Sequence, residues 1–452
     1  MIANSSSKNP THELETYLNN AKSSDLHASK IARLLKQVDE QHFHYYLAKI
    51  PTELIGAIAL ELPDRYFSEV VQSLTTKKLS EAITQLESDD QTDFIQELEE
   101  TDNTIAKAVF KQLDAEDQAE ISQLKRYHED QAGAYMQVEA FTANINEKVH
   151  NVIRNFARRK KNNELENVHK LFVLDDNDVL CYTVGMDDLL IFNVNQTLKE
   201  NIAAYPNPFT QKEALDTEDI QVIARYFEEY DLIVVPIVNE QGQMVGRITS
   251  DDIYPVIHNH ATEQMYHLAG LDDNVEEDDD ILSSAAARAS WLSINLVTAI
   301  IASLVIAIFQ DTLESIVALA ILMPIVASMG GNAGTQSLTV VVRQLALGDI
   351  ATKDAVRTIK KEVLIAMGNG LLFSLLMGAI AAIWFDQNKL GIVIALSMLI
   401  NIITAGFFGA TIPLLLKRFN IDPAIGSTVI LTTVTDVIGF LSFLGLASAL
   451  LL

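Results

Sequence analysis

The sequence has very little cysteine and no excess of positive charge. Cys181 is the single cysteine among 452 residues, so no internal disulfide can form, and we expect a reducing compartment around the part that contains it. The formal net charge is −27. Because nucleic-acid binding needs clustered Lys and Arg, we exclude nucleic acid as a partner. P-loop, Gly-x-Ser-x-Gly and His-Glu-x-x-His motifs are also missing, and we predict that the chain is not an enzyme.

Acidic residues are concentrated in the first two thirds of the chain. Residues 1–280 contain 52 acidic and 24 basic side chains, whereas residues 281–452 contain 8 and 9. An acidic polar part is therefore followed by a nearly neutral, apolar part. For so many carboxylates a cation is the expected partner.

The last third contains five apolar stretches, each at least as long as the roughly 18 residues that indicate a bilayer-spanning helix. Four of them have no charged residue, and the fifth contains one acid, Asp436. They are Trp291–Phe309, Ser315–Val342, Val363–Phe385, Leu390–Leu416 and Ala424–Leu452. We therefore predict a multi-pass protein in a lipid bilayer, with five spans in residues 285–452.

Charges in the loops predict the orientation of these spans. Residues 343–361 and 417–418 hold seven bases, whereas the loops at 310–314 and 386–389 hold one. By the positive-inside rule the first pair of loops is cytoplasmic. The polar start of the chain does not resemble a signal peptide. We thus expect a protein of the cell (inner) membrane, with its N-terminus in the cytoplasm and its C-terminus outside.

Asp436 is the most informative residue of the membrane part. It follows Ala424 by 12 residues, or roughly 18 Å along a helix, which is near the middle of a hydrocarbon core. A charge there costs on the order of 2.5–3.5 kcal/mol. Thr428, Thr432 and Thr435 recur near the same helical face. A water-filled path that admits cations explains this polar face, and a protonated Asp at a helix contact is the alternative.

The second span contains the run Met329–Gln336, with three glycines and the amides Asn332 and Gln336. Glycines let a helix or an ion approach the backbone, and irregular backbone is tolerated at this depth only where protein or water covers it. Ordinary small-residue helix packing is the alternative. The two amides, together with an intramembrane Asp in another span, favour a polar pathway.

The polar part shows two patterns. In residues 1–130, Leu62, Leu74, Leu86 and Leu98 recur every 12 residues, which predicts a stack of helix pairs or a plain helical bundle. Residues 173–188 can be laid over residues 237–252 at an offset of 64. Each copy predicts strand, turn, strand and a helix with an Asp pair at its N-cap. A helix over 251–271 and a solvated acidic linker over 272–280 should follow.

Several segments together resemble one family. They are Glu129–Met136, the 64-residue repeat, Met323–Pro324 with Gly330–Gln336, and Asp422–Ala424 with Thr432–Asp436. In this order they are similar to the MgtE family of magnesium channels. The resemblance implies a multidomain membrane protein with an all-α helical N domain at 1–132 and an α/β CBS pair at 133–200 and 201–254. A long connecting (plug) helix with an acidic linker at 255–284 and a five-helix transmembrane domain at 285–452 would follow.

The resemblance also implies a function and a pore. The chain would form a homodimer that conducts hydrated Mg²⁺ along the dimer axis, and Mg²⁺ sheds its water reluctantly. Asp436 of each subunit would face the ion, with Glu314 and Asp422 gathering cations near the mouths. The pore set is Asp436, Thr432, Thr428, Asn332, Gly331, Asp422 and Glu314. Thr428–Val429 departs from the family, which often has a polar residue followed by Pro there.

Regulation by cytoplasmic Mg²⁺ is implied as well. The acids that match the family's sensor are Asp89, Asp93, Asp231, Asp252 and Glu263. Where further acids are expected, the chain has Ala57, Pro255, His260 and Gln264. We therefore hypothesise weaker or differently tuned Mg²⁺ gating, modulated by pH through His258, His260 and His267; incidental histidines on a solvated helix are the favoured alternative for these three.

ATP is a candidate ligand of the CBS pair. A proton- or sodium-coupled divalent-cation exchanger that uses Asp436 as its carrier carboxylate is an alternative to a channel. A CBS-regulated membrane protein of another function is a further alternative.

Overall fold

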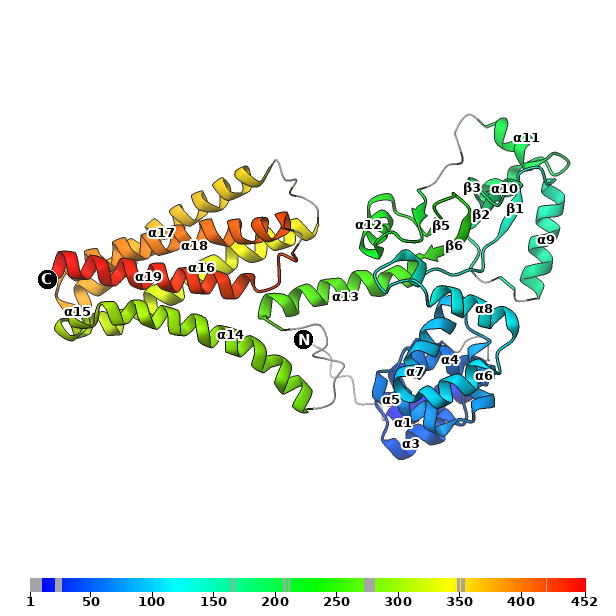
Figure 1. Cartoon of the computed structure of the whole chain (residues 1–452), viewed down its shortest axis with the longest axis horizontal. Helices are drawn as coiled ribbons and strands as arrows, with labels where there is room; N and C mark the ends of the chain where they lie inside the picture. The colour runs from blue at the N-terminus through cyan, green and yellow to red at the C-terminus, as the bar shows by residue number, and fades with distance from the viewer. Residues whose placement is uncertain are drawn as a thin grey trace. The chain divides into compact units, whose positions relative to one another are not determined.

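The computed structural model describes residues 10–20, 27–162, 164–165, 167–205, 209, 212–271, 281–347, 350, 354–419 and 421–452 (Figure 1). It forms two compact units, Met1–Asn259 and His260–Leu452. The predicted acidic linker at 272–280 lies outside the described residues.

The first unit begins with helices, as predicted. They are α1 (Pro10–Asn20), α2 (Ala28–Leu35), α3 (Glu40–Leu47), α4 (Thr52–Leu60), α5 (Asp64–Ser73), α6 (Thr76–Ile83), α7 (Ser88–Phe110) and α8 (Ala115–Leu124). Side chains of Asp39, Thr75 and Asp114 cap α3, α6 and α8, because each accepts a hydrogen bond from a free amide of the first turn. Phe67 and Phe94 pack in the shared core with ring centroids 5.0 Å apart. This core fixes the start of α7, where the acids discussed below lie.

Two three-stranded sheets follow. The first contains β1 (Thr142–Asn144), β2 (Lys170–Leu174) and β3 (Leu180–Gly185), and the second contains β4 (Ala214–Leu215), β5 (Val234–Val238) and β6 (Met244–Thr249). In each sheet the first pairing is parallel and the second antiparallel. The register of β2 with β3 equals that of β5 with β6 shifted by 64 residues, with the same irregularity after Val173 and Ile237. The predicted repeat is therefore a structural pair.

Helices α9 (Val149–Lys161), α10 (Met186–Ile191), α11 (Leu198–Ala203) and α12 (Ile220–Tyr230) accompany the sheets, and the short 3-10 turn Ala132–Ala134 precedes them. The prediction that an Asp pair caps each repeat helix is wrong in detail. Gly185 is the N-cap of α10, and Asp187–Asp188 lie in its first turn. Asp251–Asp252 lie likewise in the first turn of α13 (Ser250–Ala269). Their charges still face the positive end of the helix dipole.

The second unit contains five helices long and apolar enough to cross a membrane, in agreement with the prediction. They are α14 (Ile281–Ile308), α16 (Val317–Ala346), α17 (Ala355–Phe385), α18 (Asn388–Arg418) and α19 (Ser427–Leu451), with the short α15 (Gln310–Ser315) between the first two. The five run lengthwise beside one another (Figure 1). Helix α18 is the most buried and α14 the most exposed, so α18 forms the centre of the bundle.

Candidate cation sites

Asp436 lies in the middle of α19 and is partly exposed. Its carboxylate has no hydrogen bond or ion pair with any residue that the structure describes. The hydroxyls of Thr432 and Thr433 donate to carbonyls of their own helix, 3.0 and 2.6 Å away. Thr435 is fully buried, so the prediction that it shares the open face of Asp436 is wrong. The polar face of α19 is formed by Thr428, Thr432 and Asp436, which are four residues apart and partly exposed; it is open at Thr432 and Asp436, whereas Thr428 contacts α13.

Helix α16 presents a second polar face. Ser328, Asn332, Thr335, Gln336 and Thr339 are exposed and follow one another at helical spacing. Asn332 Nδ2 donates to Ser328 Oγ at 3.3 Å. The run from Met329 to Gln336 lies inside an uninterrupted helix, so irregular backbone does not contribute here. A polar face of this length inside an apolar helix is costly in lipid and requires water or protein against it.

The glycines of that run differ in their surroundings. Beyond the adjacent backbone, no described atom lies within 4 Å of a Cβ built on Gly331, whereas a Cβ on Gly330 would clash with Asn401 Nδ2. Gly331 thus belongs to the open face with Asn332, and Gly330 to a helix contact. Both interpretations of the glycines therefore apply. The open path fits Gly331, and helix packing fits Gly330.

The end of α13 is attached to the membrane helices within the second unit. Thr428 Oγ1 donates to Leu268 O at 2.8 Å, and His267 Nδ1 lies 3.0 Å from Asp422 Oδ2. Leu268 also packs against a small apolar cluster that includes Leu338 and Leu431. Two residues predicted for the pore, Asp422 and Thr428, therefore contact the connecting helix.

In the first unit, acids meet at the starts of α7 and α13. Asp89 is 6% exposed, and its Oδ1 has no hydrogen-bond partner among the described residues. Burial and the charge of Asp252 raise the pKa of Asp89 well above its ordinary value. Asp252 itself accepts from Thr249 N at 3.1 Å and from Gln137 Nε2 at 3.2 Å. Burial raises the pKa of Asp252 to about 6.

Two neighbours extend this acidic cluster. Burial and the charge of Asp251 raise the pKa of Asp90 to about 6. Burial and the charges of Asp90 and Asp252 raise the pKa of Asp93 to about 7, although the Asp93 side chain still reaches solvent. We define the acidic cluster as Asp89, Asp90, Asp93, Asp251 and Asp252. Ionised together these carboxylates repel one another, and a cation near them would lower that repulsion.

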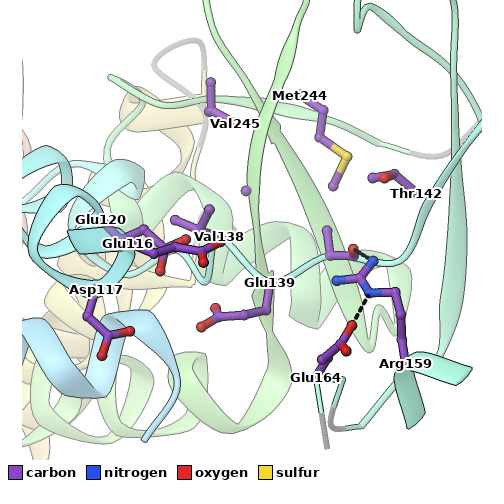
Figure 2. A pocket seen from close by; sticks show the side chains of 12 residues that line it. Glu116, Asp117, Glu120, Val138, Glu139, Thr142, Arg159, Glu164, Met244 and Val245 are labelled. Atoms are coloured by element: carbon purple, nitrogen blue, oxygen red, sulfur yellow. Dashed lines mark hydrogen bonds and ion pairs between the residues drawn. The ribbon is translucent and has the colours of Figure 1, made fainter. Parts of the chain in front are cut away.

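A second group of acids lines a cavity of about 620 Å³ between α8 and the sheet segments (Figure 2). Glu116, Asp117, Glu120 and Glu139 lie on one side of it, and the ion pair of Arg159 with Glu164 on the other. Burial and the charge of Glu139 raise the pKa of Glu120 to about 7. Glu116, Asp117 and Glu120 share helix α8, whereas Glu139 and the Arg159–Glu164 pair come from other segments, so only the fold brings the whole group together.

Other predicted residues lie apart from these clusters. Asp231 is exposed at the left-handed C-cap of α12, with a φ of 50°. Glu263 lies 3.6 Å from His260 on α13, and Glu314 accepts from Gln310 Nε2 on α15. Within the described ranges, no three His, Cys, Asp or Glu side chains are close enough to hold a metal ion directly. Any site here would hold a cation through water or be completed by another chain.

Comparison with known proteins decides the family. A family model described as a divalent cation transporter, MgtE, matches residues 323–446. Models of the MgtE intracellular N domain and of the CBS domain match residues 26–130 and 214–259. A magnesium transporter MgtE from Thermus thermophilus is 32% identical over 342 residues, which cover 75% of this chain and 74% of that protein. The chain belongs to the MgtE family.

A second relative from the MgtE family agrees with this assignment. A magnesium transporter MgtE from Bacillus subtilis is 32% identical over 285 residues, covering 63% of this chain and 62% of that protein. Among solved structures, the cytosolic domain of the Mg²⁺ channel MgtE in complex with ATP matches with a TM-score of 0.49 and 24% identity, over 54% of this chain and 99% of that one.

Membership of the MgtE family confirms three predictions: the family itself, the multidomain membrane architecture and the absence of enzymatic activity. Sequence reasoning missed other residues of interest. They are Asn401, the acids of the cavity in Figure 2, and the contact between His267 and Asp422. For Asn401 one signal was available, because it is an asparagine inside the otherwise apolar fourth span.

Proposed function

We propose that the chain forms a homodimer of the inner membrane that conducts hydrated Mg²⁺ along the dimer axis and is regulated by cytoplasmic Mg²⁺. The single observation that carries this proposal is the unpartnered Asp436 on an open polar face of a membrane helix. A second polar face on α16 adds to it. Lipid disfavours both faces, whereas a water-filled path between two subunits would solvate them.

The chemistry of this path suits a hydrated divalent ion. Two copies of Asp436 would supply two negative charges against the two positive charges of Mg²⁺. Because Mg²⁺ keeps its inner water shell, carboxylates and neutral oxygens can hold it at a distance. Asn332, Thr432 and Thr428 would offer such neutral oxygens, and Gly331 leaves room for the water shell beside α16. Glu314 would attract cations at the outer mouth.

For regulation, we propose that Mg²⁺ binds at the acidic cluster and thereby joins α7 to the start of α13. Asp89, Asp93 and Asp252 supply the carboxylates there, and Glu263 and Asp231 would contribute through a second subunit or another state. The far end of α13 is attached to α19 through Leu268 and Thr428. Helix α13 has 20 residues and a length of about 30 Å, and it carries residues of both sites, Asp252 at its start and Leu268 at its end.

Orientation follows from the loop charges, with the N-terminal unit in the cytoplasm and the C-terminus outside. ATP binding at the CBS pair stays a prediction.

Uptake by the reconstituted full-length chain tests the proposed function. Mg²⁺, Mn²⁺, Co²⁺ and Ca²⁺ would be compared side by side in liposomes at defined membrane potential. We expect Mg²⁺ uptake that follows its electrochemical gradient and does not depend on a proton or sodium gradient. Uptake that requires such a gradient would instead support a coupled exchanger.

A further inference from the structure

Asn401 is a buried polar residue in the middle of α18. Its side chain is 0% exposed, and Nδ2 donates to Val326 O of α16 at 2.9 Å. Its Oδ1 is buried and has no hydrogen-bond partner among the described residues. An amide with an unused acceptor inside a membrane bundle is costly, so its retention needs an explanation beyond packing.

The amide lies between two glycines on two other helices. A Cβ on Gly330 of α16 would lie 2.2 Å from Asn401 Nδ2, and a Cβ on Gly439 of α19 would lie 2.7 Å from the same atom. Neither position can therefore carry a side chain without moving the amide. Through this one side chain, three helices are held at a fixed separation.

These contacts lie next to the open polar faces. Gly330 precedes Asn332 by two residues on α16, and Gly439 follows Asp436 by three residues on α19. Any change in the separation of α16 and α19 at Asn401 would therefore shift the two polar faces relative to each other within one helical turn. Selectivity among divalent ions depends on the size and rigidity of the site that receives them.

We propose that Asn401 is a positioning residue that sets the separation of the Asn332 and Asp436 faces and thereby the selectivity for Mg²⁺ over larger cations. The proposal rests on the function proposed above. Val326 O is already the acceptor position for the backbone of Gly330 within α16, so the bond from Asn401 adds a second donor to that carbonyl. The bond fixes α16 in rotation as well as in distance.

The test compares uptake of Mg²⁺ with uptake of Ca²⁺ by full-length protein in liposomes. Asn401→Leu keeps the volume of the side chain and removes the donor, and Gly439→Ala pushes against the amide from the other helix. We expect each variant to lower the Mg²⁺ to Ca²⁺ uptake ratio by about three- to tenfold, the range that one interhelical hydrogen bond can account for. The matched control is Gly368→Ala on α17, where no atom lies within 4 Å of the added methyl group.

An unchanged Mg²⁺ to Ca²⁺ uptake ratio in both variants would overturn the inference. A fall in the uptake of both ions that matches the loss of folded dimer, and leaves this ratio unchanged, would also overturn it. If Asn401→Leu does not fold, Gly439→Ala decides alone. Asp436→Asn is measured in the same assay. Normal uptake by Asp436→Asn would contradict the proposed function, whereas an inactive Asp436→Asn with unchanged ratios in the other variants would contradict only the role of Asn401.

Discussion

At the scale of single residues, the carboxylates of the acidic cluster repel one another, and a bound cation would lower this repulsion. Asp89 is almost fully buried, its Oδ1 has no partner among the described residues, and Asp252 and Asp90 raise its pKa. Fixed carboxylates of this kind destabilise the unliganded fold when they ionise. The same feature makes the fold sensitive to cation concentration.

Asp89→Asn should therefore stabilise the protein in the absence of divalent cations, because one buried like charge is removed. It should also reduce the stabilisation that added Mg²⁺ gives. Thermal unfolding of the full-length protein in EDTA and in Mg²⁺ measures both effects. Glu240→Gln, an exposed acid in the turn between β5 and β6, is the control. A lower stability of Asp89→Asn in EDTA would contradict this account.

The cluster also predicts a pH dependence. The pKa values of Asp90 and Asp252 are raised to about 6 by burial, so between about pH 4 and 6 the folded state binds more protons than the unfolded chain and stability falls as the pH rises. Protons then compete with Mg²⁺. Limited proteolysis of the full-length protein over a range of Mg²⁺ concentrations measures this competition. We expect the Mg²⁺ concentration for half-maximal protection to be at least about threefold higher at pH 6 than at pH 8. Equal midpoints would argue against cation binding at these acids.

Some of these residues could be predicted from sequence and others could not. Asp436 stands out because a single charge in an apolar span is visible without a structure. Asp89 and Asp252 were grouped only through the resemblance. Asn401, Gln137 and Glu139 depend on neighbours far away in the chain, so only the fold brings their contacts together.

At the scale of elements, the polar face of α16 is the feature that a cysteine scan can test. Because Cys181 is the single cysteine, one substitution gives a cysteine-free background. Cysteines at Asn332, Gln336 and Thr339 should react with a charged, membrane-impermeant thiol reagent, since we expect water along this face. Cysteines at the exposed apolar positions Ile321 and Val340 should not. Equal reactivity of both sets would contradict a water-filled path beside α16.

The end of α13 predicts an effect of substitution at its contact with the membrane helices. His267 Nδ1 lies 3.0 Å from Asp422 Oδ2 in the segment between α18 and α19. Trp291, which lies against Gly270 and Gly426 near this contact, can report on it. In a Trp384→Phe background, His267→Leu should shift the emission of Trp291, because the substitution removes a polar contact that holds the end of α13. Emission unchanged by His267→Leu would contradict a role of this contact in holding α13.

The elements themselves were largely predictable. Apolar length alone located the five spans, and the 64-residue repeat predicted the strand pairs β2–β3 and β5–β6, whereas β1 and β4 were not predicted. Besides the helix caps and the expected irregular backbone, the placement of Thr435 was wrong, because this residue is buried. Residues three or four positions apart on a helix lie on only approximately the same side. The packing of neighbouring helices therefore determines which of them is buried.

At the scale of the whole molecule, charge separates the two units. A strongly acidic N-terminal part and a nearly neutral membrane part are joined by α13, whose first turn holds Asp252 and whose last turn holds His267. This one helix therefore carries residues of both the acidic cluster and the membrane contact. The sequence predicts the helix, but its attachment at Leu268 and Thr428 follows from the fold.

Uptake of Mg²⁺ into liposomes by Asp436→Asn tests the central claim most directly. The substitution keeps the size and polarity of the side chain and removes its charge, while Asp386→Asn removes an equal charge from the loop between α17 and α18. We predict that Asp436→Asn loses Mg²⁺ uptake by at least about tenfold and remains folded, and that Asp386→Asn behaves like the unmodified protein. Uptake by Asp436→Asn equal to that of Asp386→Asn would contradict the claim that this carboxylate faces the ion.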